Sequence, residues 1–176
     1  MKILTIIMLI LLSGKIFFAQ NSNLCSISRD TIVTDSANQQ RMLLGFCNRQ
    51  VFQDTSFSWW FNSLYDMYEV DSITASKIKG TLNNITIAIV MGTWCSDSRK
   101  LVPKFFKILD YLKFSDGKIS ILTVGRNKKG KANETDSLKI ELVPTIIFYR
   151  NGAEIGRIVE SPKETLERDL LKILSG

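Results

Sequence analysis

The stretch 85–103, ITIAIVMGTWCSDSRKLVP, limits the possible folds of this chain more than any other part of it. It opens with apolar and β-branched residues over 85–91, a composition typical of a strand that is buried on both faces of a sheet. Gly92 interrupts this run, and beyond it apolar residues recur at the spacing of a helix. The sequence therefore predicts a strand that delivers Cys95 to the first turn of a helix over 96–114.

The predicted position of Cys95 favours a reactive thiolate. The first N–H groups of a helix have no partner within the helix, and the helix dipole is positive there, so an anion is stabilised. The alternative is that Cys95 is a small buried hydrophobic residue, because free cysteines are often buried. These residues alone leave both interpretations open.

Several motifs, in the right order and spacing, resemble those of the thioredoxin family. Residues 94–98, WCSDS, are similar to its active-site signature, in which Trp-Cys is followed by two residues and a second cysteine. Pro103 matches the proline that the family carries on the same helix. The segment 143–145, VPT, is similar to the family's cis-proline segment, and 148–152, FYRNG, to its final hairpin. The resemblance covers about residues 73–175.

The resemblance implies an α/β protein with a thioredoxin-like fold, in which a central mixed β-sheet is flanked by helices, preceded here by a small N-terminal extension. It implies that Cys95 is the nucleophile. It also implies that Trp94, Val143 and Pro144 position an extended substrate beside that nucleophile. The residues that would support this site are Ser96, Asp97 and Pro103.

The chain departs from the family pattern at its second cysteine, which is Ser98 here. A disulfide cannot form within this Cys-x-x-Ser motif. Cys95 can still attack a substrate disulfide, and the Ser98 hydroxyl can donate a hydrogen bond to the thiolate. Release of the mixed disulfide then needs another thiol. The sequence predicts a thiol–disulfide oxidoreductase or isomerase with a single nucleophilic cysteine, no cofactor, and glutathione or another low-molecular-weight thiol as the candidate co-substrate.

Two other functions stay open. A redox-inactive binding module of the cell envelope would use the groove beside the cis-proline to hold an extended chain by strand-like hydrogen bonds. Loss of the second cysteine favours this module, whereas retention of Trp94 and Cys95 favours catalysis. A peroxide-sensing thiol that cycles through sulfenic acid ranks last.

The composition excludes several classes of function. The chain has no histidine, which removes Ser-His and Cys-His catalysis and the usual zinc sites. Its three cysteines are too few for a cysteine-only tetrahedral zinc site, so no metal is predicted. A net charge of +6 without a long basic run or a recognisable motif gives no indication of nucleic-acid binding.

Residues 1–19 are predicted to be a secretory signal peptide, with a charged start at Lys2, an apolar run and a cleavage point after Ala19. Export to the periplasm or the outside of the cell follows, with no stable membrane insertion after cleavage. The expected partners are cysteine-containing proteins or mixed disulfides of the envelope. Cys25 and Cys47 could form a disulfide there; the alternatives are two unpaired thiols, or a Cys47 that resolves an intermediate on Cys95.

The predicted organisation has three parts: the signal peptide at 1–19, an N-terminal extension at 20–70, and a thioredoxin-like domain at 71–176. The aromatic face of a helix in the extension is expected to pack into a core rather than to bind a ligand. The expected strands cover 31–33, 42–44, 85–91, 118–124, 145–150 and 154–159. The expected helices cover 57–68, 72–82, 96–114 and 137–141, and a last helix opens at 161–164.

A polar loop over 125–137 carries three basic residues, Arg126, Lys128 and Lys129. Parallel strands end at the same edge of a sheet, so this basic rim should lie on the same edge as Cys95. One interpretation is that the rim attracts anionic partners and favours the Cys95 thiolate. The other is that the loop is simply solvated.

Overall fold

A five-stranded mixed sheet forms the centre of the protein, in the strand order β3-β5-β4-β6-β7. The structure is a computed structural model that describes residues 32–132 and 134–176. The middle strand β4 (Ile85–Met91) runs parallel to β5 (Ile119–Thr123) and antiparallel to β6 (Thr145–Arg150). The edge strands, β3 (Gly45–Cys47) and β7 (Ala153–Val159), are both antiparallel to their neighbours. The predicted α/β class and mixed sheet are confirmed.

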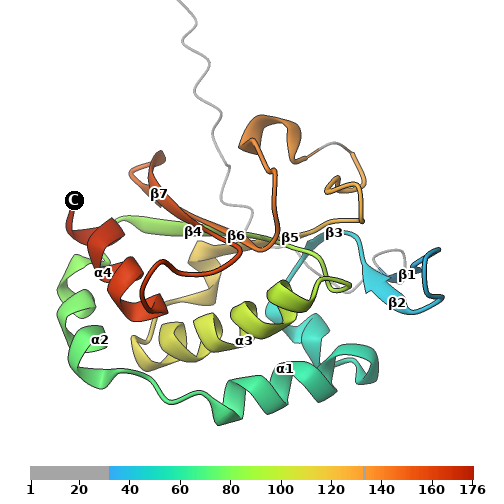
Figure 1. Cartoon of the computed structure of the whole chain (residues 1–176). Helices are drawn as coiled ribbons and strands as arrows, with labels where there is room; N and C mark the ends of the chain where they lie inside the picture. The colour runs from blue at the N-terminus through green and yellow to red at the C-terminus, as the bar shows by residue number, and fades with distance from the viewer. Residues whose placement is uncertain (1–31, 133) are drawn as a thin grey trace, which may run out of the picture.

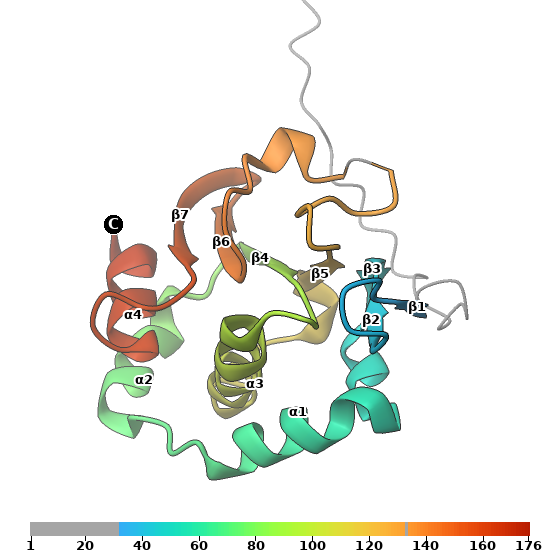
Figure 2. The ribbon, with the colours of Figure 1, turned by 45° about the vertical axis from the view of Figure 1, so that its right-hand side comes forward.

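Four α-helices lie together on one side of this sheet (Figures 1 and 2). They are α1 (Thr55–Met67), α2 (Ser72–Ile78), α3 (Ser96–Tyr111) and α4 (Leu166–Ser175). A separate hairpin of β1 (Ile32–Thr34) and β2 (Arg41–Leu43) precedes β3. Short 3-10 turns cover Arg49–Gln53, Lys79–Thr81, Asp116–Lys118 and Asp136–Leu138.

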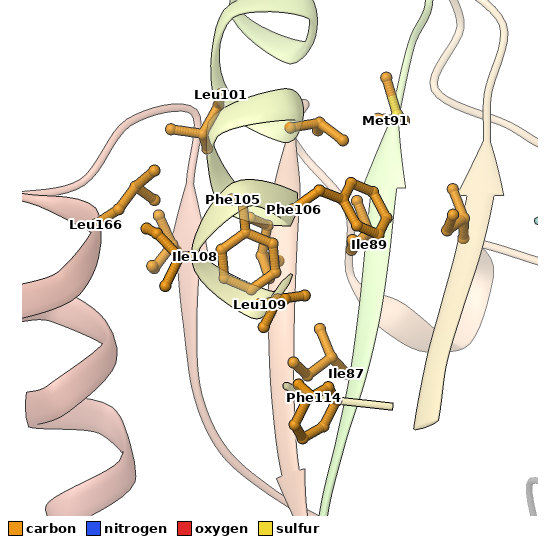
Figure 3. Close-up of a cluster of buried hydrophobic side chains, with 14 of the residues drawn as sticks. Ile87, Ile89, Met91, Leu101, Phe105, Phe106, Ile108, Leu109, Phe114 and Leu166 are labelled. Atoms are coloured by element: carbon orange, nitrogen blue, oxygen red, sulfur yellow. The ribbon is translucent and has the colours of Figure 1, made fainter. Parts of the chain in front are cut away.

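The alternation of β4 divides its side chains between two apolar clusters. Ile87, Ile89 and Met91 face the large core, where α3 packs its Phe105 and Phe106 against the sheet (Figure 3). On the opposite face, a smaller cluster forms from Val90, Leu122, Val124 and Val143, with Trp94, Cys95, Leu138 and Ile140 packed against it. Cys95 therefore belongs to the face of the sheet that the helices do not cover.

The segment predicted as an N-terminal extension contributes to the same sheet and core as the rest of the chain. Its strand β3 pairs with β5, and its helix α1 packs along α3. As predicted, the aromatic face of α1 enters the core: Phe61 stacks on Phe52 with ring centroids 4.9 Å apart and lies 5.9 Å from the ring of Phe106. Arg49 fastens this layer by a bidentate ion pair with Asp110 of α3.

Phe61→Ala should lower the free energy of unfolding by about 3–5 kcal/mol, because the change leaves a cavity between α1 and α3. Trp59→Ala, on the same helix but with a side chain 65% exposed, should change it by less than about 0.5 kcal/mol. Urea unfolding followed by circular dichroism measures both. Equal effects of the two substitutions would show that α1 does not pack as described.

Three sequence-based helix predictions are wrong in their bounds. The last helix begins at Leu166 rather than near Ser161, because Thr165 caps it and the N–H groups of Lys163 and Glu164 donate to the Asp169 carboxylate instead. The helix expected over 137–141 is a 3-10 turn over Asp136–Leu138, and Lys139, which follows it, has a φ of +52°. The helix expected over 72–82 ends at Ile78 and continues as a 3-10 turn.

Strand β3 was not predicted at all. In the part of the chain that the structure describes, no helix is long and apolar enough to cross a membrane. The predicted signal peptide and Cys25 lie outside the described residues.

Candidate active site

Cys95 lies between the end of β4 and the start of α3, as the sequence predicts. Its backbone is extended, and it occupies the N-cap position of α3. Its N–H donates to the carbonyl of Gly92 at 2.9 Å, and its carbonyl accepts the N–H of Arg99 at 3.1 Å. The side chain is partly exposed. The thiol is thus both reachable from solvent and placed at a helix N-terminus.

The predicted substrate-positioning segment lies directly against this thiol. The Sγ of Cys95 donates a hydrogen bond to the carbonyl oxygen of Val143 at 3.2 Å, and the Val143–Pro144 peptide bond is cis. Two hydrogen bonds pin the segment: Thr145 Oγ1 donates to the carbonyl of Leu142, and the N–H of Glu160 donates to the carbonyl of Pro144. The structure thereby brings together residues that are 48 positions apart in the chain.

Ser98 has a different contact from the one that the sequence predicts. Its side chain is fully buried, and its Oγ accepts a hydrogen bond from the N–H of Gly92 at 3.2 Å. No hydrogen bond joins the described side chains of Ser98 and Cys95. Ser98 therefore fastens the turn between β4 and α3, and the predicted contact with the sulfur is not formed.

Trp94 is held on two sides. Its Nε1 donates to the carbonyl of Val124 at 2.9 Å, and the guanidinium carbon of Arg126 lies 5.1 Å from the centre of its ring. A Cβ atom at Gly92 would come within 2.6 Å of the indole, so only glycine permits this close approach. The indole of the residue that precedes Cys95 is therefore fixed in place.

Three charged side chains lie close to Cys95 in the sequence, and they differ in burial and in their contacts: Asp97, Arg99 and Lys100. Burial lowers the pKa of Arg99, and the nearby charge of Cys95 acts in the opposite direction. The Nε of Arg99 donates to the carbonyl of Thr93. Asp97 lies 4.0 Å from Lys100, which offsets its charge at the surface. Arg99 is therefore a cation that interacts electrostatically with Cys95.

The other two residues predicted to support the site lie on α3. Ser96, its first residue, is exposed, and Pro103 is buried within the helix.

The predicted basic rim is not one uniform surface. Arg126 forms an ion pair with Asp35 of the β1–β2 hairpin, with 2.8 Å between its Nη2 and the carboxylate. Lys129 lies 3.9 Å from Asp136. Lys128 and Lys129 line a hollow of about 490 Å³, together with Asn127, Thr135, Asp136, Lys139, Ile140 and Glu141. Arg126 is thus the rim residue that contacts the Trp-Cys motif.

Cys47 lies on the other side of the sheet from Cys95. It pairs with Ile121 in β5 and belongs to the large core, whereas Cys95 packs on the smaller cluster. This separation argues against Cys47 as the residue that resolves an intermediate on Cys95. Its pairing with Cys25 stays a prediction, because Cys25 lies outside the described residues. Within residues 32–132 and 134–176, no three acidic or cysteine side chains gather into a metal site.

Sequence reasoning missed two residues of the site, Asp35 and Thr93. Thr93 Oγ1 accepts the backbone N–H of Leu43 at 3.0 Å, and Asp35 reaches Arg126 across 91 positions of chain. Neither contact has a local sequence signal. The one available indication for Thr93 was that it is a polar residue shortly after the buried strand β4.

The family model described as Thioredoxin matches residues 70–172. A curated protein named "Putative thioredoxin-5", from Dictyostelium discoideum, is 34% identical over 101 residues, which is 56% of this chain and 92% of that protein. Among solved structures, the Fasciola hepatica thioredoxin is 15% identical with a TM-score of 0.38, covering 57% of this chain and 86% of that one. An N21Q mutant thioredoxin from Halobacterium salinarum is 13% identical with a TM-score of 0.36, covering 57% and 80%.

Proposed function

The chain belongs to the thioredoxin family, and from that membership we propose that it is an exported thiol–disulfide oxidoreductase or isomerase that works through Cys95 alone. Membership supports a thiol–disulfide oxidoreductase type of function in general. The single-cysteine form of the proposal depends on one observation. Cys95 is partly exposed beside Val143, whereas the position of the second family cysteine is occupied by a buried serine.

The proposed reaction has two exchange steps. In the first, the Cys95 thiolate attacks one sulfur of a substrate disulfide, the Cys95–substrate disulfide forms, and the other substrate sulfur leaves as a thiolate. In the second, an external thiolate or a second substrate cysteine attacks the substrate sulfur and releases Cys95. The enzyme ends in the state in which it began, so no net oxidant is needed. Glutathione or a similar low-molecular-weight thiol is the proposed co-substrate.

Val143 is proposed to control when the sulfur becomes reactive. The hydrogen bond from Cys95 to the Val143 carbonyl requires the thiol proton. Loss of that proton removes the bond and leaves the thiolate at the N-terminus of α3, where the helix dipole favours a negative charge. A substrate disulfide would then approach along the side that Val143 and Trp94 border.

The same hydrogen bond favours one other function, a redox-inactive module that binds extended chains. A thiol that keeps its proton on the Val143 carbonyl is a poor nucleophile. The pH dependence of Cys95 alkylation separates the two. An alkylation rate that rises only near pH ~8.5, as for an ordinary thiol, would favour the module.

Mass spectrometry after brief exposure to a peptide disulfide tests the proposal directly. We expect an adduct on the peptide that contains Cys95, and we expect glutathione to release it. An adduct that forms only on another cysteine would show that the proposal is wrong. The proposed export has its own test, since secreted protein should begin at Gln20.

Arg99→Gln should slow the alkylation of Cys95 at neutral pH and low salt by about threefold or more, because a nearby cation favours the thiolate. Lys100→Gln is the matched control. Lys100 is exposed and lies beside Asp97, so its removal should leave the rate nearly unchanged. Rates with iodoacetamide measure both. Equal rates for both variants and the native protein would show that Arg99 does not affect the reactivity of Cys95.

A further inference from the structure

The carboxylate of Asp35 is the most deeply buried charge near the proposed site. Asp35 is only 2% exposed, although it lies in the turn after β1. A buried carboxylate needs a partner, and Arg126 supplies one: its Nε lies 3.1 and 3.0 Å from the two carboxylate oxygens, and its Nη2 lies 2.8 Å from one of them. Hydrogen bonds from Arg126 and Ala37 lower the pKa of this carboxyl, so it stays ionised at neutral pH.

The same guanidinium lies over the indole of Trp94, 5.1 Å from the ring centre. An arginine in this position is attracted by the ring and, because its fork is planar, holds a defined orientation. The ion pair with Asp35 holds Arg126 in this position. The carboxylate, the guanidinium and the indole thus form a chain of contacts that ends one residue before Cys95.

A second contact joins the same segment to the same loop. The backbone N–H of Leu43 donates to Thr93 Oγ1 at 3.0 Å, within the buried interior. Residues 35–43 therefore hold two successive residues, Thr93 and Trp94, that immediately precede Cys95.

We propose that Asp35 is a positioning residue for Cys95, which acts through Arg126 to hold Trp94 as a fixed wall of the substrate-binding side. This inference rests on the proposed function, because it concerns the approach of a disulfide to the same sulfur. It assigns a working role to the hairpin of β1 and β2. It also gives Arg126 a role other than attracting anionic partners.

The test compares two rate constants at Cys95, one with the small reagent iodoacetamide and one with the bulkier neutral disulfide dithiodipyridine. In the second reaction the Cys95 thiolate attacks one sulfur, a Cys95–thiopyridine disulfide forms, and thiopyridone leaves. Mass spectrometry of the Cys95 peptide assigns the product. Both reagents are uncharged, so a change of protein charge affects their encounter with the sulfur equally.

Asp35→Asn and Arg126→Gln should each slow the dithiodipyridine reaction by about tenfold while changing the iodoacetamide rate by less than about twofold. The double variant should be no slower than either single one, because the two residues act as one unit. Arg126→Lys should restore little, since an ammonium lacks the planar fork. Arg41→Gln, which breaks the exposed ion pair of the same hairpin with Asp54, is the control and should change neither rate.

Quenching of tryptophan fluorescence by acrylamide supplies a readout that a purely structural ion pair would not move. Subtracting the signal of Trp94→Phe isolates Trp94, which should become more accessible in Asp35→Asn and Arg126→Gln. Unchanged quenching together with an unchanged ratio of the two rates, in variants that remain folded, would overturn the inference.

Failure of the proposed function would appear differently, as a lack of disulfide turnover in the native protein. If Asp35→Asn does not fold, Arg126→Gln decides alone, because Arg126 is 45% exposed and tolerates truncation better.

Discussion

Cys95→Ser should lower the rate of disulfide exchange by about three orders of magnitude or more, because the reaction then has no nucleophile. The substitution removes the reactive sulfur and little else. A serine hydroxyl can still donate to the Val143 carbonyl, and the extended N-cap position of residue 95 suits serine well. The variant should therefore remain folded, and thermal unfolding will verify this. The rate is measured by reduction of a protein disulfide such as that of insulin, with glutathione present.

Cys47→Ala is the matched control for this experiment. Cys47 is buried in the large core, on the other face of the sheet from Cys95, so its removal should leave the exchange rate close to that of the native protein. Two results would contradict the assignment of the nucleophile. One is a Cys95→Ser protein that keeps its activity; the other is a loss of activity in Cys47→Ala with normal folding.

The part of the site that could be predicted from sequence is the part that local signals encode. The β-branched run of β4, the glycine that ends it and the helical spacing beyond placed Cys95 at the start of α3 without any knowledge of the fold. The approach of Val143 to Cys95 could not be obtained this way. It came from the resemblance to a family, because spacing along a chain does not encode contacts across 48 residues.

The late start of the last helix, the missed strand β3 and the missed contact of Asp35 share a physical cause, which is competition from partners outside the local sequence pattern. Ser161 has a good sequence for a helix cap, but Asp169 accepts the N–H groups of the residues that follow it, and the helix starts later. Strand β3 is only three residues long and is defined by its pairing with β5 rather than by its own pattern. The contact between Asp35 and Arg126 is of the same kind.

Ser98→Cys should convert the proposed single-cysteine enzyme into an ordinary dithiol reductase. Position 98 lies on the first turn of α3, three residues after Cys95, so we expect a thiol there to come within reach of the Cys95 sulfur. A thiol introduced there can attack the mixed disulfide on Cys95 from within the same molecule. Such an attack has an effective concentration in the millimolar range or above. Turnover with a dithiol reductant should therefore rise by about tenfold or more, and the mixed disulfide should no longer accumulate.

Because Ser98 is buried, Ser98→Cys is also expected to change the stability of the protein. Its Oγ accepts the N–H of Gly92, and sulfur is a weaker acceptor, so the reduced variant should lose about 1 kcal/mol of stability. Oxidation should then close a disulfide and reduce the mass of the intact protein by about 2 Da, one hydrogen atom for each sulfur.

Ser96→Cys provides the comparison for this gain, since it places a thiol in the same helical turn but at an exposed position adjacent to Cys95. Neighbouring residues meet the geometry of a disulfide poorly, so this variant should show neither the mass change nor the gain in turnover. A folded Ser98→Cys protein that kept two free thiols under oxidising conditions would mean that the side chain of residue 98 points away from the sulfur. In that case two differences would separate this protein from a dithiol enzyme: the missing second cysteine, and the orientation of the turn that the Gly92–Ser98 hydrogen bond holds. The orientation of the turn would be the more important of the two, because restoring the cysteine would not restore the activity.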